Sequence, residues 1–280
     1  MKTWNNRQKI CLWLVVAVLV LGAVTVAGMA LADRAVATDL TRKNAAPCAS
    51  FPFGTDWLGR DMLARTLCGL SLSIRIGLLT AAVSAVCALG LGAAAATMGR
   101  RVDAVISWLT DLVLGIPHIL LVLLISLACG KGFWGVVAGV SLSHWPSLAR
   151  VLRGEILQLK PAPYVLVAGK LGASRGQIVR RHMLPHVLPQ FGVGLILQFP
   201  HAILHEASIT FLGFGLPPEQ PAIGVILSES MRYLTTGKWW LALFPGLALV
   251  LVVLLFAGIG DRVKTWLTQA YPSPWIAPTM

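Results

Sequence analysis

Long uncharged stretches of apolar residues alternate with shorter charged segments along this chain of 280 residues. The first stretch, Ile10–Ala32, contains 23 consecutive uncharged positions. As an α-helix rising about 1.5 Å per residue it would be about 34 Å long, which matches a bilayer core of about 30 Å. Similar stretches predict six membrane-spanning helices, over residues 10–32, 76–99, 104–130, 132–149, 191–212 and 239–260. The third of these is expected to bend at Pro117.

A cleaved signal peptide is the alternative interpretation of the first stretch. Its 23 residues exceed the usual apolar region of about 7–15 residues, and no small-residue cleavage site precedes the next polar segment. We therefore expect a retained membrane helix.

Two segments between the spans are long enough to hold structure of their own. Leu58–Arg75 has a mixed polar and apolar face, which predicts an amphipathic helix lying on the outer membrane surface before the second span. Segment 150–190 predicts a helix–turn–helix outside the membrane, with a short helix before Gly172 and another over about Ser174–His182. Gly172 suits the turn because glycine accepts a positive φ, and we expect Pro185 to end the second helix.

Composition agrees with a membrane protein. Hydrophobic residues make up 56% of the chain and charged residues 12%, with a mean hydropathy of +0.76. Soluble domains carry about 25% charged residues, so a soluble enzyme, a disordered chain and a secreted disulfide-rich domain are all excluded. The five cysteines are scattered without a C-x-x-C pair, so we expect neither a disulfide framework nor a cysteine metal site.

The formal charge of +12 is unevenly distributed between the two sides of the predicted membrane. With a cytoplasmic N-terminus, the inner segments 1–9, 100–103, 150–190 and 261–280 hold 14 Lys and Arg against three acids. The outer segments then hold nine Lys and Arg against six acids. Because cytoplasmic loops are enriched in Lys and Arg, both termini are predicted to be cytoplasmic, and the basic charge requires no nucleic-acid partner.

Several ordered motifs resemble one family of transport proteins. Tyr164–Pro185 resembles the EAA loop of ABC importer permeases, with its glycine at Gly172, 108 residues before the end of the chain, followed by Ile178, Leu184 and Pro185. Where that family has Glu-Ala-Ala, this chain has Leu166-Val167-Ala168, so any salt bridge of that glutamate is lost. Further segments resemble the C-type permease of dipeptide, oligopeptide and nickel importers: Phe53–Asp61, Arg101–Asp103 with Asp111 and Pro117, Thr210–Leu216 and Leu243–Leu247.

The resemblance implies an all-α ABC type I importer permease, in a bacterial inner membrane, that works only as part of a complex. It implies a second, similar permease subunit, two cytoplasmic ATPases that hold ATP and Mg²⁺, and a periplasmic solute-binding protein. It also implies ATPase coupling through the loop residues Gly172, Ala173, Ser174, Arg175, Ile178, Leu184 and Pro185. The domain organisation would be an N-terminal helix and periplasmic segment (1–75), a permease core (76–262) containing the coupling loop, and a cytoplasmic tail (263–280).

The chain itself lacks the phosphate-binding motif of an ATPase. The nearest sequence, Gly258–Thr265, has Val263 where the second glycine of that motif is required. We therefore expect a non-catalytic subunit without a cofactor of its own. A secondary transporter or channel is a weaker alternative, since no inverted repeat is evident.

Polar residues inside the predicted spans suggest a substrate path. His201 and His205 are four residues apart on one helical face, Glu206 follows, and His144 lies near the end of the fourth span. Imidazoles bind nickel, copper or zinc, so His201 and His205 are candidates for transient metal ligation.

These histidines also resemble those of the nickel-type permeases, so import of nickel or a metal chelate is the main hypothesis. Di- or oligopeptide import, with structural histidines, is the alternative. Three other histidines, His118, His182 and His186, are interpreted as structural, and Asp111 as one partner of an ion pair rather than a proton relay.

Overall fold

The computed structural model describes residues 6–270, and the regular structure of these residues is helical. Residues 271–280 of the predicted tail lie outside them, and residues 263–270 continue the last helix. The helices are α1 (Asn6–Ala30), α2 (Ala32–Val36), α3 (Met62–Thr97), α4 (Arg100–Gly115), α5 (His118–Ala128), α6 (Phe133–Leu159), α7 (Pro163–Lys170), α8 (Arg175–Ile178), α9 (Leu184–Phe211), α10 (Ile223–Leu234) and α11 (Trp240–Ala270), with a 3₁₀ turn η1 (Leu40–Arg42) and a π-helical turn η2 (Val179–Met183).

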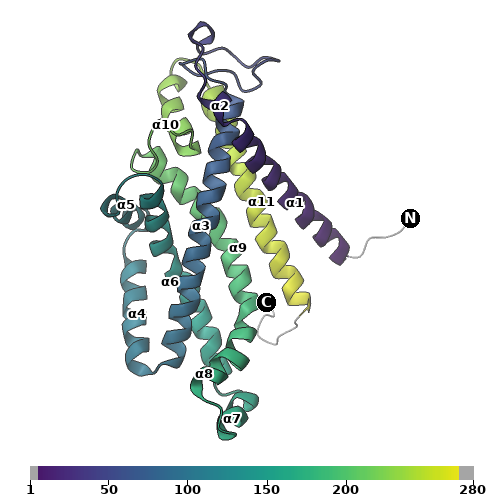
Figure 1. Cartoon of the computed structure of the whole chain (residues 1–280), viewed down its shortest axis with the longest axis vertical. Coiled ribbons are helices and arrows are strands. Elements are labelled where there is room, and N and C mark those ends of the chain that lie inside the picture. The colour runs from purple at the N-terminus through teal and green to yellow at the C-terminus, as the bar shows by residue number, and fades with distance from the viewer. Residues whose placement is uncertain (1–5, 271–280) are drawn as a thin grey trace, which may run out of the picture.

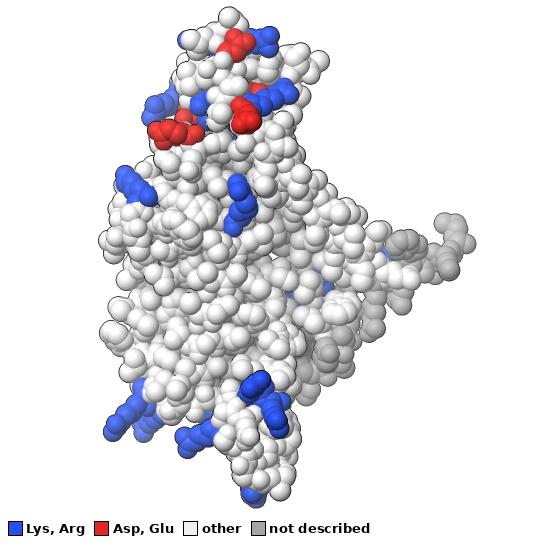
Figure 2. Space-filling model, in the orientation of Figure 1, with Lys and Arg blue, Asp and Glu red and all other residues white. Residues whose placement is uncertain are grey.

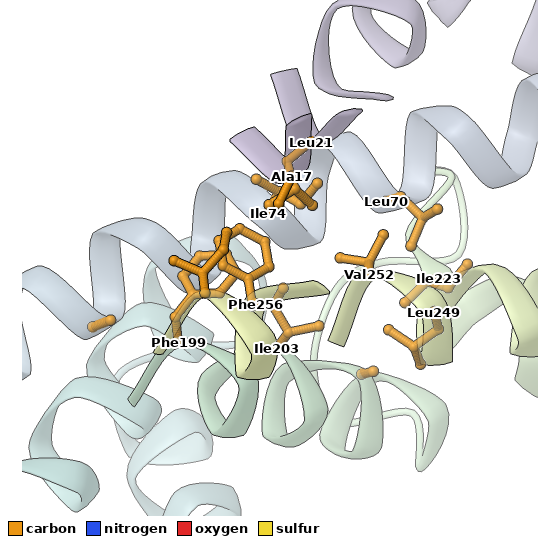
Figure 3. Close-up of a cluster of buried hydrophobic side chains, with 13 residues drawn as sticks. Ala17, Leu21, Leu70, Ile74, Phe199, Ile203, Ile223, Leu249, Val252 and Phe256 are labelled. Atoms are coloured by element: carbon orange, nitrogen blue, oxygen red, sulfur yellow. The ribbon is translucent and has the colours of Figure 1, made fainter. Parts of the chain in front are cut away.

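The long helix α3 lies at the centre of the bundle and packs against α1, α6 and α9 (Figure 1). Segment 37–61 covers one end of the bundle, and α7 and α8 project from the other. An apolar core joins α1, α3, α9, α10 and α11, and its labelled side chains point toward one another in Figure 3. Phe199 of α9 and Phe256 of α11 pack at its middle, with ring centroids 3.6 Å apart.

Four helices of the described chain are long and apolar enough to cross a membrane: Gln8–Ala30, Met62–Thr97, Arg175–Phe211 and Trp240–Leu267. A fifth crossing is reached if α4 and α5 together form one span. The predicted span 132–149 lies in α6, which packs against α3. Serines and His144 lower the hydropathy of this helix, and it is not among the candidate spans. Within residues 6–270, length and composition alone therefore do not reach the predicted count of six spans.

The predicted third span is bent at Pro117, as the sequence indicates. It divides into α4 and α5, whose axes are bent by 102°. Pro117 explains the break, because a residue that precedes proline is pushed out of the helical region, and Ile116 has the extended angles φ −88° and ψ 136°. The bend places His118 at the first position of α5.

The predicted surface helix over Leu58–Arg75 is wrong. Residues 62–75 of this segment form the start of α3, which continues without a break into the second span. Asp61 starts the helix, because its carboxylate accepts hydrogen bonds from the amides of Leu63 (2.9 Å) and Ala64 (3.4 Å). Arg65, only 1% exposed, is buried rather than lying at a membrane surface.

A buried ionic network holds segment 37–61 against the bundle. Asp56 has no exposed surface and forms ion pairs with Arg60 (2.6 Å) and Arg65. Arg65 also contacts Glu229 of α10 at 2.9 Å, so the network links the segment to two helices. Gly59 permits the tight turn, since a side chain there would lie 1.8 Å from the carbonyl oxygen of Asp39 and its φ is +73°.

Candidate functional site

The projecting α7–α8 hairpin, Pro163–Ile178, has the helix–turn–helix form that the sequence predicts. Gly172 takes a φ of +89° in the turn between the two helices. Ser174 then caps α8 in a capping box: its hydroxyl accepts from the amide of Gln177 (3.3 Å), whose side chain accepts from the Ser174 amide (2.9 Å). The turn and the cap together fix the shape of the hairpin.

The surface of this hairpin is unusually apolar for a segment outside the bundle. Leu171 is 82% exposed, and Tyr164, Leu166 and Val167 are each about half exposed. The hairpin also carries a shallow hollow, lined by Tyr164, Val167, Ala168, Leu171, Gly172, Ala173, Gln177 and His182. An exposed apolar patch with a small concavity is typical of a protein-docking surface.

Basic side chains lie on this hairpin and directly after it. Arg175, Arg180 and Arg181 are exposed, and Figure 2 shows only Lys and Arg among the charged residues at this end of the visible face. The 37–61 end of the same face carries both signs. The position of the missing family glutamate, Leu166, is exposed and adds to the apolar surface.

The second predicted helix does not end at Pro185, which corrects the sequence-based expectation. The chain passes from α8 through η2 into α9, and Arg175–Phe211 forms one helical segment of 37 residues. Pro185 comes just after the π-helical turn η2, and such a local π turn accommodates the missing amide proton of proline. Leu184 begins α9, and Ile178 packs against a core that contains the buried Met183 and Val187.

A second site lies inside the bundle, where three helices bring three histidines together. His118 begins α5, His144 lies on α6 and His205 on α9. Their ring centroids are 4.5 Å apart for His118–His144, 4.4 Å for His118–His205 and 5.0 Å for His144–His205. One nitrogen from each ring lies within 4.8 Å of the other two. We refer to these three residues as the histidine cluster.

Two of the rings have defined surroundings. Nδ1 of His144 lies 2.8 Å from the carbonyl oxygen of Val140, and because a carbonyl only accepts, Nδ1 carries the proton. Nε2 of His144 therefore keeps its lone pair. Nε2 of His118 is buried and has no hydrogen-bond partner among the described residues.

The other sequence-predicted path residues are not members of this cluster. His201 is exposed on α9, one turn before His205, and is not one of the three grouped histidines. Glu206 is fully buried and accepts hydrogen bonds from Ser73 of α3 (2.6 Å) and Thr210 (3.1 Å). The hydroxyl of Thr210 also accepts from the amide of Leu216, so Glu206 secures the turn after α9.

His118 is the member that sequence reasoning missed. It follows Pro117, 26 positions before His144 and 87 before His205, so no helical spacing connects them. Pro117 is the only feature of the sequence that could have indicated this role of His118, because the bend there turns the start of α5 toward α6 and α9.

Asp111 forms the ion pair that the sequence analysis expects, with Arg150 at 2.7 Å, although both side chains are exposed.

Comparison with known proteins places these features in a family. The family described as "Binding-protein-dependent transport system inner membrane component" matches residues 88–271. The chain is 31% identical to the dipeptide transport system permease protein DppC of Bacillus subtilis (strain 168), over 82% of this chain and 72% of that protein. It is 34% identical to a putative peptide transport system permease protein of Brucella suis biovar 1, over 92% of this chain and 87% of that protein.

The fold is similar to that of a solved transporter. A chain from the inward-facing conformations of the MetNI methionine ABC transporter superposes with a TM-score of 0.61, at 18% sequence identity, over 73% of this chain and 97% of that chain. At this identity the similarity shows a shared fold, with the helical arrangement of an ABC importer permease.

Proposed function

Because this chain belongs to the family of binding-protein-dependent transport system inner membrane components, we propose that it forms part of the translocation path of a peptide importer. It is the membrane-embedded permease subunit of an ABC importer, and it is not itself an enzyme, since ATP hydrolysis belongs to separate ATPase subunits. We propose a peptide as the cargo because the chain matches dipeptide and peptide permeases over most of its length.

In this proposal the α7–α8 hairpin is the contact surface for an ATPase subunit. That partner would bury the hairpin's exposed apolar side chains, of which Leu171 is the most exposed. Arg175, Arg180 and Arg181 would face acidic groups of the ATPase. ATP and Mg²⁺ bind to a pair of ATPases, and their closure pushes on the hairpin. This chain and a second permease subunit then move as rigid bodies between inward- and outward-open states, driven by the differential affinity of ATP for those states.

The orientation follows from the same surface. The basic α7–α8 end faces the cytoplasm, as the positive-inside rule favours, and the mixed-charge 37–61 end faces the periplasm and the binding protein. Both termini are then cytoplasmic.

Uptake of a radiolabelled dipeptide by cells that lack this chain, complemented with variants, tests the proposal. We expect the wild-type chain to restore uptake and Leu171→Asp to abolish most of it while the protein remains in the membrane. The matched control is Leu171→Met, which keeps an apolar side chain at the same exposed position (82% exposed) and should restore uptake. Equal uptake with Leu171→Asp and wild type would refute the docking role of the hairpin.

Import of nickel or a metal chelate is a second candidate, favoured by one observation, the histidine cluster. The same cells distinguish the two cargoes. Restored uptake of radioactive nickel without restored dipeptide uptake would replace peptide with metal as the cargo. Restored dipeptide uptake alone would retain the first proposal.

A further inference from the structure

We propose that His118, His144 and His205 form a binding site for one divalent transition-metal ion within the helical bundle. The three side chains come from three different helices, and one ring nitrogen from each lies within 4.8 Å of the others. The proposal concerns an ion bound to this chain and does not depend on whether the transported cargo is a peptide.

The hydrogen bond of His144 prepares that ring for metal binding. A histidine that binds a metal through one nitrogen commonly donates the proton of its other nitrogen to a carbonyl or carboxylate, which fixes the tautomer and the ring orientation. Nδ1 of His144 already donates to the carbonyl oxygen of Val140 at 2.8 Å. Its Nε2 lone pair is therefore free for an ion.

The surroundings of His118 give an independent reason for a ligand at this place. Its Nε2 atom is buried without a hydrogen-bond partner among the described residues, and an unsatisfied buried polar atom is unfavourable. A metal ion at the centre of the cluster would satisfy it. The ring is also well placed, since the bend after Pro117 sets His118 against both His144 and His205.

The distances require only a small contraction. An ion with tetrahedral geometry and metal–nitrogen bonds of about 2.0–2.1 Å holds its ligand nitrogens about 3.4 Å apart. The nitrogens of the cluster lie within 4.8 Å of one another, so an ion would draw any pair of them closer by about 1.4 Å at most. Three protein ligands leave a fourth position open, as in sites that also bind water or another ligand.

The ligand set determines the class of ion. Imidazole suits nickel, copper, zinc and cobalt, whereas magnesium and calcium prefer oxygen ligands. The nearest carboxylate in the sequence, Glu206, is engaged by Ser73 and Thr210. The cluster is therefore a nitrogen-only site, which selects against magnesium and calcium.

Cobalt absorption tests the proposal directly. The full-length chain, purified in detergent with its co-purifying subunits and without a histidine tag, is titrated with Co²⁺, whose visible absorption increases strongly in a tetrahedral site. We expect about one Co²⁺ per chain, competed by Ni²⁺ and Zn²⁺ but not by Mg²⁺. His118→Asn, His144→Asn and His205→Asn should each weaken binding at least tenfold. The matched control His186→Asn, at an exposed position of α9, should leave binding unchanged.

A second variant keeps the test decisive if an asparagine variant unfolds. His118→Cys replaces one ligand with another, so the Co²⁺ complex should gain a thiolate-to-metal charge-transfer band that the wild type lacks. Absence of stoichiometric binding to the wild type would overturn the proposal. So would binding that depends on His201 or His186 but not on His118, since it would place the ion at surface histidines.

Discussion

Asp56 has no exposed surface, yet it accepts hydrogen bonds from the amides of Leu58 and Arg60 and from two arginine side chains. A buried carboxylate is tolerated only when it is paired and hydrogen-bonded in this way. The sequence motif around Phe53–Asp61 therefore has a structural explanation. The motif contains the carboxylate of Asp56 and the glycine turns that place this carboxylate beside Arg65.

Replacing Asp56 with alanine should destabilise the protein strongly, because Arg65 would keep a buried charge with only Glu229 as partner. We expect a loss of about 3–5 kcal/mol in the free energy of unfolding. Thermal unfolding of the purified chain in detergent measures it. The control Arg42→Ala breaks the exposed Arg42–Asp39 pair and should lose only about 0–1 kcal/mol. Equal losses in the two variants would contradict the network.

Glu155, on α6 beyond the predicted span, gives a pH-dependent prediction. Desolvation raises the pKa of its carboxyl from the usual 4.5 to about 7. Folding therefore disfavours the charged form, so the penalty is absent below the unfolded-state pKa, grows between the two values and is complete above the folded-state pKa. Glu155→Gln removes it at high pH only.

We therefore expect Glu155→Gln to raise Tm by roughly 2–4 °C at about pH 8.5, the shift that about 1 kcal/mol gives in a chain of this size. At about pH 4 the variant and the wild type should unfold at the same temperature. Thermal unfolding in detergent at both pH values checks this. A stabilisation independent of pH would show that the carboxyl is not desolvated.

At the scale of helices, close packing depends on particular glycines. Gly28 of α1 faces α3 so closely that a Cβ atom there would lie 2.2 Å from the carbonyl oxygen of Leu67. Gly22 of the same helix has nothing within 4 Å of that position. The two glycines differ only in what they face, and small residues at helix contacts are typical of membrane bundles.

Gly28→Ala should separate α1 from α3 and destabilise the chain by about 1–3 kcal/mol, as overpacked contacts do. Gly22→Ala should be neutral or slightly stabilising, because alanine favours the helix over glycine. Thermal unfolding of the two variants side by side distinguishes these outcomes. Similar Tm values for both variants would mean that the α1–α3 contact is looser than described.

Proline positions mark the limit of prediction for these elements. Pro117 and Pro185 were both expected to disturb a helix, and only Pro117 does so sharply. Pro117 lies between α4, which ends at Gly115, and α5, which begins at His118, whereas Pro185 comes just after the π-helical turn η2. The bend at Pro117 was therefore predictable from the sequence, but the π-helical turn that accommodates Pro185 was not.

For the whole molecule, apolar stretches, charge distribution and motif order were sufficient to predict a helical membrane permease with a projecting hairpin. The α7–α8 turn was predictable because Gly172 and Ser174 act through local rules. The histidine cluster was not, because His118, His144 and His205 meet only through the packing of three helices. Sequence spacing instead paired His201 with His205, which share a helix face but not the cluster.

Membrane orientation can be tested with a native residue. Cys48 is exposed in segment 37–61, and we expect a membrane-impermeant maleimide to label it in intact spheroplasts. In a variant with all five cysteines replaced by serine, Leu171→Cys should be labelled only after the membrane is opened. Labelling of position 171 from outside would invert the orientation and remove the ATPase contact.

One continuous helical segment, Arg175–Phe211, contains residues of both candidate sites, the α7–α8 hairpin and the histidine cluster. The 31 residues from Arg175 to His205 extend over about 45 Å at about 1.5 Å per residue, so one helical segment reaches from the hairpin to the interior of the bundle. His205 lies on this helical segment, whereas His118 and His144 lie on α5 and α6. If ATPase closure displaces the hairpin as proposed, the distances from His205 to the other two histidines would change with it, and the affinity for an ion bound between them would report that displacement.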